Sequence, residues 1–257
     1  MKVITTVHYN RPEYTKRCLE YLSKCRLVET YFLLACVEPE NDEVIELVRS
    51  ADFCEKKVVI NKEKLGVNTN TMQALIEGFD LSDAVIHVED DILFHEETLE
   101  YFEHCFDAYE DDDSILTVGA EHNFYESVDQ IYPKYLYELR KREWFVPWGW
   151  GTWKNRFKKM QLNHCFCGFE HEHRPEFRNK LKDSYESWDM RIGNFVVKNK
   201  FQEVYPTLSR IQNIGAEGGV HVPNAAFHAE HHHVKVWAED LNLTINDKRP
   251  WTEEKLI

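Results

Sequence analysis

Short runs of consecutive apolar residues alternate with segments of helical periodicity through the first half of the chain. The apolar runs are rich in β-branched side chains, which is typical of strands buried on both faces of a sheet. They are residues 3–7, 31–37, 57–60, 84–88 and 115–118. Between them, apolar residues at helical spacing predict helices at 12–22, 44–48, 69–79 and 96–109. This order predicts an α/β fold with a Rossmann-type, mostly parallel sheet flanked by helices.

The second half is less regular. Residues 121–150 are rich in aromatic side chains, and we expect them to loop over the sheet. Helices are predicted at 152–160, 175–182 and 187–197, and extended segments at 201–205 and 208–211. Since no linker or repeat interrupts the pattern, we expect a single domain over 1–257, with a nucleotide-binding half (1–120) and an acceptor-binding half (121–257).

Composition narrows the class of protein. Of the 257 residues, 43% are hydrophobic, which is enough for a large core. The formal net charge of -14 argues against a nucleic-acid binder, which needs a basic face. Seven cysteines without regular spacing favour a reducing compartment, hence a cytoplasmic protein. The apolar start of the chain is too short for a transmembrane segment, which leaves peripheral membrane contact open.

An apolar strand that ends in three consecutive acids, Glu89, Asp90 and Asp91, is the most informative segment. Ligands of such sheets bind beyond the carboxyl ends of the strands. Adjacent carboxylates are costly to bury unless a cation neutralises them, and their hard oxygen atoms suit a divalent ion such as Mn²⁺ or Mg²⁺. The alternative is a solvated turn that places acids near a helix N-terminus. The acidic run at 111–113 follows no apolar strand and is predicted to be solvated.

Four segments in order resemble bacterial family-2-type glycosyltransferases. They are 5–12 with 17–19 (TTVHYNRP and RCL), 89–91 (EDD), 148–153 (WGWGTW) and 209–215 (SRIQNIG). The EDD segment resembles the DxD element of this family, and is closer to the acidic triplet of N-acetylglucosaminyltransferase I. The resemblance implies a GT-A-like fold and a metal-dependent transfer of a sugar from a nucleotide donor, with UDP as the first expectation, to a hydroxyl acceptor.

The resemblance also implies residue roles. Arg11 would bind the donor diphosphate, a role that suits a guanidinium, although a surface position at a helix start is the alternative. His8 and Asn10 would lie near the nucleoside, and Glu38 would contact the base. At Gly66 and Asn68 the backbone would approach the nucleotide closely. Glu89 and Asp90 would hold hydroxyls of the ribose and the sugar. Asp91 would be the direct metal ligand, completed by a histidine near the C-terminus, for which His221 is the candidate and His228 the alternative.

An inverting transfer needs a carboxylate that takes the proton of the acceptor hydroxyl. Asp189, at the start of a predicted helix, is the candidate, and Glu186 is the alternative on the same turn. A simple preference of Asp for a helix N-terminus would also explain its place.

Aromatic side chains crowd residues 144–153, where Trp148, Gly149 and Trp150 are candidates for acceptor binding. Flat aromatic faces suit sugar rings, and glycines permit tight turns between them. An aromatic core beneath a loop is the alternative.

Two other functions compete with glycosyl transfer. A sugar nucleotidyltransferase would place a glycine-rich loop after the first strand, where this chain has 8–12 (HYNRP). A non-catalytic carbohydrate-binding or scaffold protein would have no need of the acidic triplet or of Asp189. The identities of donor sugar and acceptor, and the oligomeric state, stay open.

Overall fold

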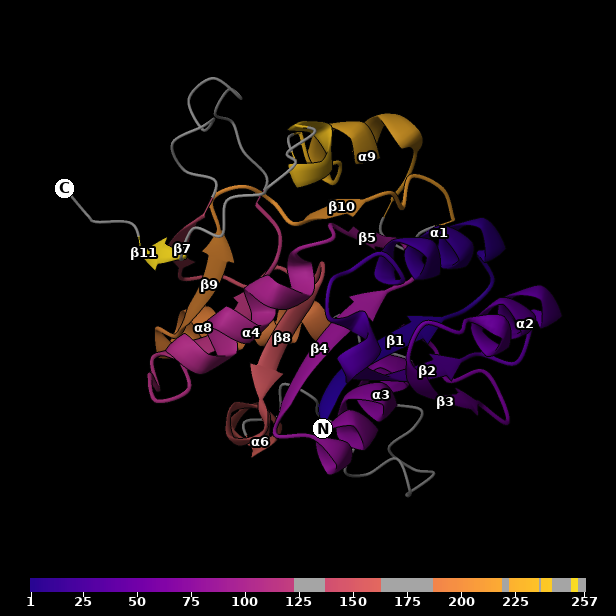
Figure 1. The fold of residues 1–257 in the computed structure, drawn as a ribbon, viewed down its shortest axis with the longest axis horizontal. Coiled ribbons are helices and arrows are strands. Elements are labelled where there is room, and N and C mark those ends of the chain that lie inside the picture. The colour runs from indigo at the N-terminus through magenta and orange to yellow at the C-terminus, as the bar shows by residue number, and fades with distance from the viewer. Residues whose placement is uncertain (123–136, 163–186, 219–221, 236, 242–250, 254–257) are drawn as a thin grey trace.

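The computed structural model describes residues 1–122, 137–162, 187–218, 222–235, 237–241 and 251–253. Within these residues, a nine-stranded sheet has the order β11-β7-β9-β6-β8-β4-β1-β2-β3, and β10 pairs with β5 in a second, small sheet (Figure 1). The strands are β1 Lys2–His8, β2 Tyr31–Val37, β3 Glu55–Ile60, β4 Ala84–Glu89, β5 Ile92–Phe94, β6 Ile115–Gly119, β7 Glu138–Arg142, β8 Trp150–Trp153, β9 Gln202–Pro206, β10 Ile211–Asn213 and β11 Thr252–Glu253. The α-helices are α1 Pro12–Leu22, α2 Asp42–Ser50, α3 Val67–Leu81, α4 Thr98–Ala108, α6 Lys154–Leu162, α8 Trp188–Asn199 and α9 Ala225–His231.

Four neighbouring strands, β4, β1, β2 and β3, run parallel and form the half of the sheet that the sequence predicts. In this register Val7 of β1 lies beside Glu89 of β4. The carboxyl ends of all four strands therefore meet at one edge, and the loops that follow them form the site described below.

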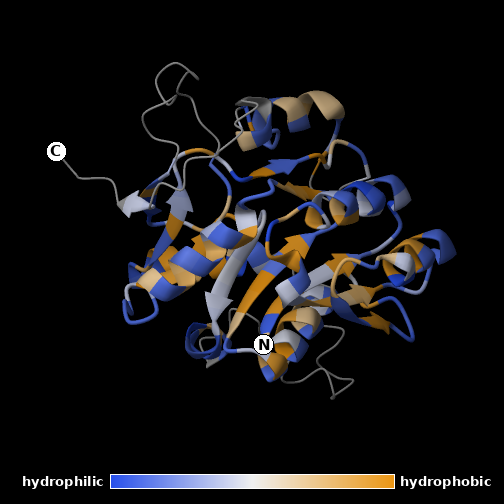
Figure 2. Ribbon diagram, in the orientation of Figure 1, coloured by the Kyte–Doolittle hydropathy of each residue, from blue (hydrophilic) through white to orange (hydrophobic). Residues whose placement is uncertain are grey.

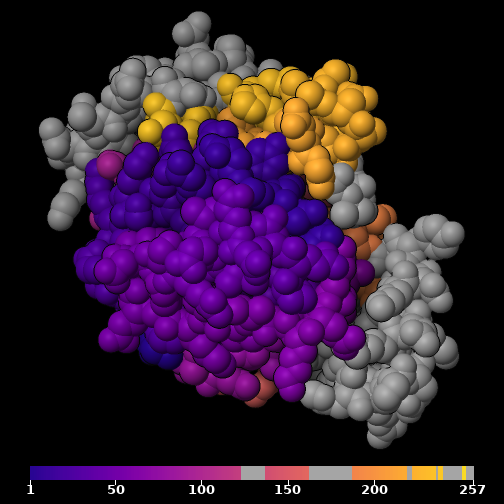
Figure 3. Space-filling model, turned by 90° about the vertical axis from the view of Figure 1, so that its right-hand side faces the viewer, coloured from indigo at the N-terminus to yellow at the C-terminus, as the bar shows by residue number. Residues whose placement is uncertain are grey.

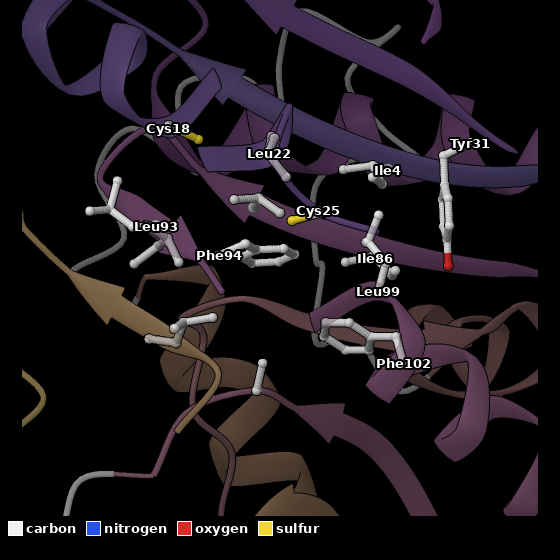
Figure 4. Close-up of a cluster of buried hydrophobic side chains, with 14 of the residues drawn as sticks. Ile4, Cys18, Leu22, Cys25, Tyr31, Ile86, Leu93, Phe94, Leu99 and Phe102 are labelled. Carbon is white, nitrogen blue, oxygen red and sulfur yellow. The ribbon is translucent and has the colours of Figure 1, made fainter. Parts of the chain in front are cut away.

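Alternate residues of each parallel strand enter two different cores. Ile4 and Ile86 pack with α1, α2 and α4 on one face (Figure 4). Val3 and Val85 pack with α3, α6 and α8 on the other. Figure 2 shows the apolar strands in the middle, with the hydrophilic sides of the helices turned outward. Burial on both faces explains why these strands are continuous apolar runs.

The expectation that residues 121–150 form only loops is wrong. Within this segment lies β7, and β8 begins at Trp150. β8 runs antiparallel between β6 and β4, where Gly151 pairs with Ile86 and Val118. Trp150, Thr152 and Trp153 favour a strand, whereas Gly151 disfavours one, and β8 is too short and too fully buried to show an alternating pattern. The predicted helix at 175–182 lies outside the described residues.

The chain returns to its N-terminal half through β10 and α9. Strand β10 pairs antiparallel with β5, and β5 is the strand that directly follows the acidic triplet. Farther along, the hydroxyl of Tyr14 in α1 accepts a hydrogen bond from the backbone N–H of Glu217 at 3.0 Å. Figure 3 shows the orange and yellow C-terminal segment against the indigo N-terminal one. None of the described helices combines the length and apolar character needed to cross a bilayer.

Candidate active site

The acidic triplet ends β4 with Glu89 and forms the turn to β5 with Asp90 and Asp91, next to Arg11 in the loop after β1. Arg11 donates from Nη1 to Oδ2 of Asp91 at 2.9 Å and from Nη2 to Oδ1 of Asp90. The two contacts form because β1 and β4 are parallel neighbours whose ends reach the same edge. The structure therefore brings together Arg11 and the triplet, as the strand-end argument predicts.

Burial and mutual repulsion disfavour the ionised form of the carboxyl groups in this cluster. Burial, followed by the charges of Asp91 and Asp90, raises the pKa of Glu89 well above its ordinary range. Burial, with a contribution from Asp91, also raises the pKa of Asp90 to about 6, although the Arg11 guanidinium opposes the shift. Oδ2 of Asp90 and Oδ1 of Asp91 are buried, and no hydrogen-bond partner for them occurs among the described residues. A cation at these oxygen atoms would relieve both the repulsion and the unsatisfied acceptors.

The other wall of the cluster comes from the loop after β10. The backbone N–H of Ile214 donates to the carbonyl of Asp91 at 2.9 Å. A Cβ on Gly215 would clash with Oδ2 of Asp91 and would stand 3.0 Å from its Cγ, so any larger residue there would require the Asp91 carboxylate to move. Oδ1 of Asn213 accepts from the N–H of Gly215 at 2.9 Å and lies 3.0 Å from Nε2 of His228.

His228 therefore lies at the acidic cluster, and the charge of Asp91 acts on its imidazole. Burial lowers the pKa of His228, with the positive charge of His233 adding to the effect. A metal ligand must be the neutral imidazole, which this environment favours. His221, the first candidate from sequence, lies outside the described residues.

These residues fit a divalent cation that is shared with a ligand. In the described part of the chain, no three His, Cys, Asp or Glu side chains converge as a complete metal site. Mg²⁺ and similar ions commonly use one or two carboxylates together with phosphate oxygens of a substrate. Asp91, with its unpartnered Oδ1, and the nearby His228 would form such a partial set.

Glu38 supports a loop in this structure. Its carboxylate accepts from the N–H of Gly66 at 2.7 Å, from the N–H of Leu65 at 3.0 and 3.1 Å, and from Nδ2 of Asn61 at 3.0 Å. Gly66 has φ +83°, and its Cβ position faces open space. These hydrogen bonds hold the loop before α3, and direct contact of Glu38 with a base stays a prediction.

The two polar residues near the end of β1 differ. His8 is buried, with Nε2 at 2.9 Å from the Thr6 hydroxyl and Nδ1 at 3.3 Å from that of Thr15. Burial, then the charge of Arg11, lowers its pKa to about 3. Since both ring nitrogens contact hydroxyls of the protein, His8 links β1 to α1 and so supports the loop that carries Arg11. Asn10 is exposed beside Arg11.

Asp189 lies in the first turn of α8, half-buried, and its charge raises the pKa of Glu89. The structure thus places the predicted base on the side of the cluster near Glu89. Oδ1 of Asn68 accepts from the N–H of Trp188, immediately before it, at 3.0 Å. Glu186 lies outside the described residues.

The aromatic segment is largely core. Trp150 is fully buried and stacks on Trp188, with ring centroids 5.8 Å apart, and Phe145 meets it edge-on. Direct contact of Trp150 with an acceptor is therefore not supported, because its ring is covered on both sides. Trp148 is half-buried against His232 of the segment after α9, and Gly149, with φ +65°, packs on Phe94.

Sequence reasoning gave no role to Asn213 and Gly215, although both lie within the 209–215 segment that carried the resemblance. It also gave none to Tyr9, whose ring lies under Nζ of Lys64 at 4.0 Å. A polar residue in an apolar segment after a strand was the available signal for Asn213. Nothing local distinguishes Tyr9.

Three solved structures are similar to this chain to different degrees. The TarS fragment 1-349 from S. aureus matches with a TM-score of 0.53 and 11% identity over 82% of this chain and 60% of that chain. The same fragment in complex with UDP-GlcNAc matches with a TM-score of 0.40 and 17% identity over 53% and 38%. The mannosyltransferase PcManGT from Pyrobaculum calidifontis, in complex with GDP-Man and Mn²⁺, matches with a TM-score of 0.43 and 13% identity over 62% and 46%.

The first of these matches confirms the fold class predicted from sequence, a mixed α/β, GT-A-like sheet flanked by helices. The chain spans less than two thirds of the length of each of these proteins. No family model and no curated protein matches this chain.

Proposed function

We propose that this protein is a metal-dependent glycosyltransferase that moves a sugar from a nucleoside-diphosphate donor to a hydroxyl acceptor. The observation that carries the proposal is the cluster of Arg11, Asp90 and Asp91 at the carboxyl edge of the parallel strands. A cation-binding set of oxygen atoms beside a guanidinium suits a diphosphate, which needs both a divalent ion and a positively charged donor of hydrogen bonds. The GT-A-like fold supports the same reading.

Asp91, together with His228 or His221, would hold Mn²⁺ or Mg²⁺. When bound, the ion supplies electrostatic stabilisation of the charge that develops on the diphosphate as it leaves. Arg11 binds and orients the same diphosphate. Glu89 and Asp90 hold hydroxyls of the ribose or sugar. Burial raises the pKa of Glu89 well above its ordinary range, which favours a carboxyl group that can donate a hydrogen bond.

Asp189 takes the proton of the acceptor hydroxyl as that oxygen attacks the sugar carbon from the face opposite the diphosphate. One displacement of this kind inverts the configuration at that carbon. The support is positional, since Asp189 lies at the start of a well-packed helix, close enough to Glu89 for the two charges to interact.

UDP-GlcNAc is the first donor to test. The acidic triplet resembles that of N-acetylglucosaminyltransferase I, and the TarS fragment of like fold has been crystallised with UDP-GlcNAc. Acceptor binding is assigned to the side of Asp189, with Trp148 as the aromatic candidate that is not enclosed in the core.

The test is nucleotide release from a panel of nucleotide sugars, with Mn²⁺ or with a chelator, by wild type and Asp91→Asn. We expect metal-dependent release from one donor in the wild type and a loss of at least about 100-fold in the variant, as for removal of a group that stabilises a leaving charge. Asp111→Asn, at an exposed acid, is the matched control. Release of pyrophosphate from a nucleoside triphosphate and a sugar phosphate, without transfer, would instead identify a nucleotidyltransferase.

A further inference from the structure

The first turn of α8 is held by a residue from the donor side of the molecule. The N–H groups at a helix start have no partner within the helix, and a side chain normally satisfies one of them. Ser187, at the N-cap of α8, makes no side-chain capping bond. Oδ1 of Asn68 accepts from the N–H of Trp188 instead, across 120 residues of sequence.

The side chain of Trp188 is fixed independently. Its ring stacks on Trp150 and meets His87 edge-on, with centroids 5.7 Å apart and planes at 86°. Trp188 is buried. Core packing therefore anchors the indole, while Asn68 fixes the backbone of the residue immediately before Asp189. Two constraints of different origin thus fix the backbone position from which the side chain of Asp189 extends.

Asn68 is itself on a rigid support. It lies in the first turn of α3, two residues after Gly66, and the N–H groups of Leu65 and Gly66 both donate to the buried Glu38. Nδ2 of Asn61 also donates to Glu38 and to Oδ1 of Asn70, which ties this turn to the ends of β2 and β3. The loop beside the donor strands and the start of α8 therefore form one connected unit.

We propose that Asn68 is a positioning residue, which sets the place of Asp189 relative to the donor through the backbone of Trp188. This inference rests on the proposed function and replaces the expectation that Asn68 contacts the donor. A displacement of about 1 Å at a catalytic group can lower a rate by on the order of 100-fold. Loss of the Asn68 bond should therefore affect turnover and leave the binding of donor intact.

The experiment compares Asn68→Ala with Asn68→Asp. Alanine removes the acceptor, whereas aspartate keeps an oxygen for the Trp188 N–H and lacks the amide nitrogen with which asparagine could contact a donor. Val67→Ala, at an exposed neighbour in the same turn, is the control. Hydrogen exchange of the amides at 65–66 and 188–190 is measured with the donor dissociation constant, kcat and the thermal midpoint.

In Asn68→Ala we expect faster exchange at Trp188, unchanged protection at Leu65 and Gly66, kcat lower by about 10- to 100-fold, and a donor dissociation constant within about twofold of wild type. Asn68→Asp should restore protection at Trp188 and most of kcat. Weaker donor binding with unchanged kcat in Asn68→Ala would overturn the inference in favour of a direct donor contact.

Unchanged exchange at Trp188 in Asn68→Ala would also overturn it, whatever the activity. The glycosyltransferase function and the positioning role of Asn68 are contradicted by different results. A wild-type protein that turns over no donor would contradict the glycosyltransferase assignment, whereas the exchange rates do not depend on turnover and still decide whether Asn68 holds α8.

Discussion

Gly215 lies against Asp91 so closely that a Cβ at this position would stand 3.0 Å from the carboxylate Cγ and would overlap Oδ2. The loop after β10 therefore packs against the Asp91 carboxylate, whose Oδ2 also accepts a hydrogen bond from Arg11 at 2.9 Å. Rotation of the Asp91 side chain is restricted on two sides, by a guanidinium and by a backbone.

Substitution Gly215→Ala should displace the Asp91 carboxylate and weaken Mn²⁺ binding in the presence of nucleotide, by about tenfold or more. Calorimetric titration with Mn²⁺ and UDP measures the effect. Gly193→Ala is the control, because a Cβ there meets no atom within 4 Å and lies in a helix. It should stabilise the protein by about 0.5–1 kcal/mol. Equal Mn²⁺ affinity in both variants would remove the assigned role of Gly215.

Substitution Asp189→Asn should abolish transfer and leave donor binding unchanged, because the amide keeps the shape of the side chain but does not accept the acceptor proton. We expect kcat to fall by about 100- to 10,000-fold, the range for loss of a general base. Product formation and the donor dissociation constant are measured side by side. Asp83→Asn, at an almost fully exposed acid, is the control. Substantial turnover in Asp189→Asn would assign the base elsewhere.

Substitution Glu38→Gln should loosen the loop before α3. Glutamine would set an NH₂ group against N–H donors that now bond a buried carboxylate, which costs about 1–3 kcal/mol in the free energy of unfolding. Urea denaturation measures this cost, and a rise in the donor KM is expected with it. Glu40→Gln, at a more exposed acid near the same loop, is the matched control and should behave as wild type.

Stability should depend on pH through Asp90. Its pKa is raised by burial from 3.8 to about 6, so between these two values the folded protein binds more protons than the unfolded chain. The free energy of unfolding therefore falls as pH rises through this window, with Asp90 contributing on the order of 1–3 kcal/mol.

Urea denaturation in a chelator, from pH 4 to 7, tests this dependence in wild type and Asp90→Asn. Because the raised pKa of Glu89 also makes stability fall as pH rises, the variant should show a smaller decline than wild type across the window, whereas Asp111→Asn, at an exposed acid, should keep the full decline. Parallel curves for wild type and Asp90→Asn would show that Asp90 titrates normally.

The donor half of the site was predictable because its residues follow strands. Apolar runs marked β1, β2 and β4, and parallel strands bring their carboxyl ends to one edge, so Arg11 and the acidic triplet were expected at the same edge of the sheet. Periodicity also indicated α3 and α8 to within a few residues. These elements are determined locally, by burial on two faces of a strand and on one face of a helix.

Long-range packing decided the rest. Trp150 is a core residue because β8 enters the sheet between β6 and β4, and His228 reaches the acidic cluster because β10 pairs with β5. The hydrogen bond from the N–H of Trp188 to Asn68 joins α8 to α3 across 120 residues, and no local sequence pattern indicates this contact. The sequence by itself determined the elements of the N-terminal half and the strand-end chemistry, since hydrophobic periodicity is local. Only the tertiary structure decided which residues complete the site, because those contacts depend on how distant segments pack together.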